Sequence, residues 1–147
     1  MSQADTPARD AQTLLDRFGL GPSTERFERG LARQRELDPA IAEEVLASLA
    51  DIAPDFGRLT IEFPFGDIYS RPGLDLAQRE ITTLAVLAAL GQERQLKVHI
   101  RFARNVGLGE RQIVEILMQV AVYAGWGRAL DALRAAEEVF AGDPARP

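Results

Sequence analysis

The chain has 147 residues, a net charge of −5, 46% hydrophobic residues and no cysteine, a length that suits one domain. These values exclude general disorder, disulfides and thiol chemistry, and the acidic balance argues against binding nucleic acid, which requires a basic face. We expect a soluble, cytoplasmic protein with no membrane partner, because the amino-terminal sequence lacks a secretory pattern and the longest apolar run, residues 81–90, is too short to span a bilayer.

Residues 1–37 are polar, and apolar positions become dense only from Asp38 onward. This first segment still contains a signal for the end of a helix, because Gly19 follows a run containing Leu14, Leu15 and Phe18. We therefore predict a peripheral arm of one or two short helices over 1–37, followed by the main domain over 38–147.

Residues 54–74 are the hardest to assign. Residues 60–63 alternate like a short strand, but Pro64 interrupts the pattern and no partner strand is visible. A kinked helix is favoured, with an apolar face made of Phe56, Leu59, Phe63, Ile68 and Tyr69.

The other apolar segments have helical spacing. Helices are predicted over 38–50, 75–91, 93–106, 110–124 and 128–140. Asp75 and Gln78 have the spacing of a capping box, and Gly91 is suited to the end of the same helix. That helix is apolar over most of its circumference and belongs at the centre of an all-α fold.

His99 and Glu80 are the leading catalytic candidates. His99 shares the inward stripe of its helix with Leu96 and Ala103, and Glu80 shares another inward stripe with Leu76 and Leu84. Imidazole titrates near neutral pH and suits general acid–base chemistry, whereas a buried carboxylate needs a partner. That partner could be His99, Arg79 or Arg71. The alternatives are a core histidine bonded to a carbonyl, and an ion pair that only locks helices together.

Other positions carry weaker signals. Arg71, in a turn, could bind a carboxylate through two parallel hydrogen bonds, or could simply be solvated. Tyr123 and Trp126 flank Gly125 at a helix end, where they could line a pocket, the core or a subunit contact, and Glu115 is expected to face solvent. With one histidine and no cysteine, a transition-metal site is not favoured, and no metal or other cofactor is expected.

Three segments together resemble the carboxymuconolactone decarboxylase family: GDIYSRPGLD at 66–75, the stretch over 79–108, and EILMQVAVYAG at 115–125. The resemblance implies an all-α, alkylhydroperoxidase-like fold in a single domain, assembled into a homotrimer or homohexamer. Peroxidases of this superfamily carry CxxCxxxH; here His99 falls on its histidine, while Gln92 and Gln95 replace the cysteines. Glu80 falls where those enzymes have a proton-relay glutamate.

The resemblance further implies a cofactor-free lyase that converts γ-carboxymuconolactone, a small acidic lactone, to 3-oxoadipate enol-lactone in protocatechuate catabolism. His99 would deliver a proton and Glu80 would orient it. Arg71 or Arg79 would bind substrate, and Tyr123, with Leu84 and Leu96, would exclude water. The decarboxylase branch usually has serine at position 80 and proline at position 127, where this chain has Glu80 and Gly127. A sister activity on a related acidic lactone or enol, or a binding or scaffold role without catalysis, therefore stays open.

Overall fold

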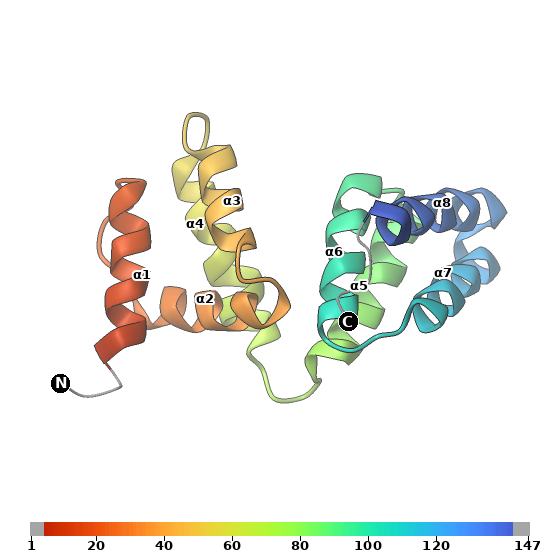
Figure 1. Ribbon diagram of the computed structural model, residues 1–147, viewed down its shortest axis with the longest axis horizontal. Helices are drawn as coiled ribbons and strands as arrows, with labels where there is room; N and C mark the ends of the chain where they lie inside the picture. The colour runs from red at the N-terminus through yellow and green to blue at the C-terminus, as the bar shows by residue number, and fades with distance from the viewer. Residues whose placement is uncertain (1–4, 143–147) are drawn as a thin grey trace. The chain divides into compact units, whose positions relative to one another are not determined.

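The computed structural model describes residues 5–142, and side chains from Asp10 onward. The chain divides between Gly73 and Leu74 into two compact units, each of which is treated by itself. Both are built from helices, and no strand occurs within the described range (Figure 1). The prediction of an all-α fold is confirmed. The predicted boundary between an arm and a domain at residue 37 stays a prediction.

Over residues 5–73, the first unit contains four α-helices and one π-helix. They are α1 (Asp5–Arg17), α2 (Glu25–Leu37), α3 (Ile41–Leu49), α4 (Pro54–Ile61) and η1 (Glu62–Tyr69). Thr24 caps α2 by accepting a hydrogen bond from the Phe27 backbone N–H, which would otherwise lack a partner. The buried core includes Leu15, Phe27 and Ile61.

Residues 54–69 are helical rather than extended, as predicted. Pro64 has no N–H to donate and its ring crowds the preceding turn, which accounts for the change from α- to π-helical geometry here. The prediction that this apolar face is the packed side of the helix is wrong, because the side chains of Phe56, Leu59 and Phe63 are exposed. The packed side is formed instead by Gly57, Ile61, Phe65 and Gly66.

Helix α2 packs directly on the α4–η1 segment through two glycines. A methyl group at Gly30 would lie 2.3 Å from the Ile61 carbonyl oxygen, and one at Gly66 would lie 2.6 Å from the Arg26 carbonyl oxygen. The backbones approach closely because neither glycine has a side chain. Part of the predicted arm is therefore integral to the first unit.

Charged side chains also connect α2 to α4 and η1. Glu62 is buried and accepts a hydrogen bond of 2.8 Å from Arg58 Nε, with the Arg26 guanidinium 3.6 Å away. Arg26 also bonds Asp67 through both Nε and Nη2, and this hydrogen bonding holds the pKa of the Asp67 carboxyl below its ordinary value. We call these four residues the arginine–carboxylate cluster. Its cations are permanently charged.

As far as residue 142, the second unit consists of four helices. They are α5 (Leu76–Leu90), α6 (Glu93–Asn105), α7 (Glu110–Ala124) and α8 (Trp126–Gly142). Helices α5 and α6 lie side by side, and α7 packs on α8 (Figure 1). The core combines Leu84, Leu96, Ile100, Ile113 and Leu117. Over the described residues, no helix combines the length and the apolar character needed to cross a membrane.

Candidate active site

Helix α5 places Glu80 inside the second unit. The Asp75 side chain accepts from the Gln78 N–H, and the Gln78 side chain accepts from the Asp75 N–H, which confirms the predicted capping box. The helix ends at Gly91 in a left-handed conformation. With this start and phase, Glu80 lies on the same buried side as Leu84 and Ala88, and its side chain is 0% exposed. A charge in that position is unfavourable unless it is paired.

Helix α6 supplies the partner. Its inward stripe of Leu96, Ile100 and Ala103 is buried as predicted. His99 lies beside this stripe and its side chain is 15% exposed. His99 Nδ1 lies 2.9 Å from Glu80 Oε2. Of the three partners considered for Glu80, the structure therefore places His99 within hydrogen-bond distance.

The contact determines how the imidazole can act. An ionised carboxylate only accepts hydrogen bonds, so Nδ1 must carry a proton to bond it. The second ring nitrogen, Nε2, is then left to exchange a proton with another group. A buried carboxylate also stabilises the imidazolium ion that forms when the ring takes up a second proton. A carboxylate–imidazole pair at this distance can hold one proton and pass it on.

Phe102 is a neighbour of the pair that sequence reasoning missed. Its ring centroid lies 5.0 Å from that of His99, at an interplanar angle of 70°, and the residue is 1% exposed. The available signal was an aromatic residue three positions after His99, which places both on one face of the helix.

The two arginine candidates lie in different places. Arg79 is half-buried on α5, immediately before Glu80. Arg71 is exposed in the turn after η1, where its backbone N–H donates to the Ile68 carbonyl, and it belongs to the first unit.

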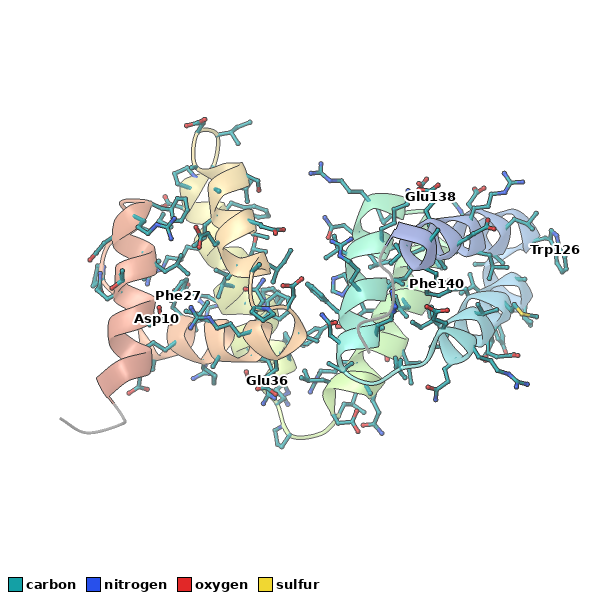
Figure 2. All side chains as sticks on the ribbon, in the orientation of Figure 1. Asp10, Phe27, Glu36, Trp126, Glu138 and Phe140 are labelled. Atoms are coloured by element: carbon teal, nitrogen blue, oxygen red, sulfur yellow. The ribbon has the colours of Figure 1, made fainter. Side chains whose placement is uncertain are left out.

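The aromatic candidates are not core residues. Tyr123 is 87% exposed and Trp126 is 72% exposed, and Trp126 projects outward at the start of α8 (Figure 2). Tyr123 lines an apolar groove between α5 and α7, together with Ile81, Ala85 and Ile116. Glu115 faces solvent, as predicted.

Over the described part of the chain, no three side chains of the ligating types His, Asp and Glu lie close enough together to hold a metal ion. Gln92 and Gln95, at the amino-terminal end of α6, are exposed.

Comparison with known proteins gives matches that cover the quoted motifs. The family model described as "Carboxymuconolactone decarboxylase family" matches residues 54–138. The 4-carboxymuconolactone decarboxylase of Acinetobacter baylyi is 35% identical over 117 residues, covering 79% of this chain and 87% of that protein. The chain belongs to the carboxymuconolactone decarboxylase family.

Two further relatives extend the comparison. The nitrosuccinic acid decarboxylase npaB of Metarhizium robertsii is 30% identical over 108 residues, covering 73% of this chain and 76% of that protein. An uncharacterized 15.0 kDa protein of Paracoccus denitrificans is 26% identical over 117 residues, covering 78% and 87%. The two named decarboxylases support a lyase-type enzyme for this member of the family. The match from residue 54 includes α4 and η1 as well as the helices that carry Glu80 and His99.

Proposed function

We propose that this protein decarboxylates γ-carboxymuconolactone, or a closely related acidic lactone, to 3-oxoadipate enol-lactone without a cofactor, as a step of protocatechuate catabolism. The observation that carries the proposal is the 2.9 Å contact between Glu80 and His99 inside the second unit. Membership of the family and the identity to a named 4-carboxymuconolactone decarboxylase support the reaction class.

The reaction balances with a single proton. The bond between carbon and the departing carboxylate breaks, CO2 leaves, and its electron pair is delocalised into the unsaturated lactone. Protonation of carbon then gives the neutral lactone ring, so the net change is substrate plus one proton to product plus CO2. The electron sink is part of the substrate. The protein must therefore orient the substrate, exclude water and deliver a proton.

His99 delivers that proton from Nε2 in this proposal. Glu80 holds Nδ1 and so fixes which nitrogen faces the substrate. Glu80 also stabilises the imidazolium form before transfer, because its charge lies 2.9 Å away and out of contact with water. After transfer the ring is neutral and takes up another proton before the next turnover.

An arginine binds the carboxylate that the substrate retains. Arg71 is the first candidate and Arg79 the alternative. Replacing the binding arginine with lysine preserves the charge but removes the two parallel hydrogen bonds to the carboxylate. KM should therefore rise about tenfold or more with little change in kcat. The other arginine serves as the matched control, since its replacement by lysine should leave KM unchanged.

A second substrate class is favoured by one comparison. The relative named nitrosuccinic acid decarboxylase shows that a protein similar to this chain is named for an acid that is not a lactone. In such an acid a nitro group can accept the electron pair in place of the unsaturated ring. The same Glu80–His99 pair would supply the proton to carbon, so this alternative changes the substrate and not the role of the pair.

The deciding experiment supplies γ-carboxymuconolactone and nitrosuccinic acid separately and follows CO2 release. Turnover of the lactone supports the proposal, and turnover of nitrosuccinate alone moves the chain to the second class. A thermal-shift measurement with the same compounds identifies the non-catalytic alternative. Stabilisation without CO2 release would indicate a binding protein, and neither signal would indicate a scaffold.

Self-association is part of the same proposal, as a homotrimer or homohexamer. The second unit exposes large apolar side chains on α5, α7 and the start of α8, which favours burial against another protein surface. They include Ile81, Val86, Leu90, Met118, Val122, Tyr123 and Trp126. Light scattering after size exclusion should give three or six times the 16.1 kDa of one chain. Val122→Glu should reduce that mass, whereas Arg111→Glu, at an exposed polar position of the same helix, should not.

A further inference from the structure

The hydrogen bond to Glu80 does not by itself fix the plane of the His99 ring. It anchors one atom, Nδ1, at 2.9 Å from Oε2. Rotation about the second side-chain torsion of histidine has broad minima. Such a rotation would carry Nδ1 away from Glu80 and change the direction of Nε2. Precise proton delivery requires a second contact.

Phe102 is placed to provide that contact. It follows His99 by three residues on α6, so the two side chains leave the same face of the helix. Their ring centroids are 5.0 Å apart at an interplanar angle of 70°. This is the edge-to-face arrangement that aromatic rings prefer. Pivoting the imidazole would disrupt this arrangement.

Phe102 is itself buried. It is 1% exposed, and a close-packed side chain of this size has little freedom to follow a moving neighbour. Glu80, at 0% exposed, is equally enclosed on α5. His99 is the more accessible member, with 15% of its side chain exposed. Two buried side chains, Glu80 on α5 and Phe102 on α6, thus contact the partly accessible ring of His99.

We infer that Phe102 is a positioning residue, which fixes the plane of the His99 imidazole so that Nε2 faces the substrate in one direction. The inference rests on the proposed function for its kinetic consequence, but not for its structural content. Phe102 acts through His99 and does not itself bind the substrate in this account.

The chain offers a clean spectroscopic test, because His99 is its only histidine. Ring-nitrogen 15N shifts report which nitrogen carries the proton, and ring currents from a neighbouring phenyl group move them little. At a pH where the imidazole is neutral, the wild-type protein should show one tautomer, with the proton on Nδ1. Phe102→Leu removes the aromatic ring and keeps an apolar side chain, so the shifts should move toward a mixture of tautomers.

The kinetic counterpart is a loss of kcat of about tenfold or more, with KM nearly unchanged, because misorientation of a proton donor affects the transition state more than binding. Phe102→Tyr keeps the ring and should restore kcat toward the wild-type value. If Phe102→Leu does not fold, Phe102→Met provides the same test.

Two control variants separate positioning from general damage. Ile113→Ala removes buried atoms from α7 in the same unit and should lower the melting temperature without changing the His99 nitrogen shifts. Phe65→Leu removes a ring from the other aromatic contact, 5.1 Å from Tyr69 in η1, and should likewise leave those shifts alone.

The outcomes are distinct. A folded Phe102→Leu protein with wild-type nitrogen shifts and wild-type kcat overturns the inference. A wild-type protein that turns over neither substrate overturns the proposed function, while the nitrogen shifts still decide whether Phe102 orients the ring. Changed shifts together with a reduced kcat support both.

Discussion

Each unit of the chain buries a glutamate, and the two glutamates have different partners. Glu62 in the first unit is bonded by Arg58 and lies near Arg26, whereas Glu80 in the second is bonded by His99. Arginine remains charged at every physiological pH, so Arg58 and Arg26 do not exchange a proton with Glu62. Histidine gains and loses a proton near neutrality. The same type of buried acid is therefore structural in one unit and suited to proton transfer in the other.

Removing the imidazole should have the largest effect on activity. His99→Gln keeps a polar side chain that can bond Glu80 but cannot deliver a proton. We expect kcat for CO2 release to fall on the order of a hundred- to ten-thousand-fold. Arg58→Gln, the corresponding change beside Glu62, should leave kcat within twofold to threefold, roughly the uncertainty of such comparisons. If kcat falls equally in His99→Gln and Arg58→Gln, the two buried glutamates do not differ in role.

Neutralising Glu80 should have a smaller effect. Glu80→Gln retains the shape of the side chain but removes the charge that stabilises imidazolium, and we expect kcat to fall on the order of ten- to a hundredfold. Circular dichroism before and after heating checks that the variant is folded. A folded Glu80→Gln protein with wild-type kcat would show that the pair is only a structural link.

Neutralising Glu62 should affect stability and not catalysis. Glu62→Gln leaves Arg58 without its carboxylate partner, and we expect the free energy of unfolding in urea to fall by roughly 1–3 kcal/mol. The value of kcat per folded enzyme should match the wild type. A lower kcat in Glu62→Gln with unchanged stability would indicate that Glu62, in the first unit, contributes to catalysis.

The smallest effect concerns Asp67, whose pKa is held below its ordinary value of 3.8, mainly by hydrogen bonds from Arg26. A carboxyl with a lowered folded-state pKa stabilises the fold above its unfolded-state pKa, and that contribution disappears as the pH falls through the folded-state value. The melting temperature should therefore drop more between pH 5 and roughly pH 3 in the wild type than in Asp67→Asn. Asp55→Asn, at an exposed site on α4, is the control. Identical pH profiles for all three would show that the Asp67 contact contributes nothing.

Local patterns predicted the second unit well. The Asp75 cap and the Gly91 stop set the phase of α5, and that phase places Glu80 inward without further information. The same reasoning applies to His99 on α6. In both cases the decisive signal was a polar residue on an otherwise apolar stripe, which spacing alone reveals.

Other features depend on packing between elements that lie far apart in the sequence. The stripe of Phe56, Leu59 and Phe63 was recognisable, but α2 packs on the opposite side, through Gly30 and Gly66. A glycine that permits close approach resembles a glycine in a turn when only the sequence is read. The exposure of Tyr123 in the single chain could not be predicted, because nothing in its local sequence specifies which face of α7 is covered.

The central claim is that Glu80 and His99 act as one proton-transferring unit, and a double-mutant cycle on kcat tests it most directly. The rates of Glu80→Gln, His99→Gln and the double variant are compared with that of the wild type on the lactone. Because Glu80 acts only through the imidazole, the double variant should be no slower than His99→Gln alone. If the fold loss of kcat in the double variant equals the product of the two single losses, the two residues contribute independently. That result would contradict the central claim.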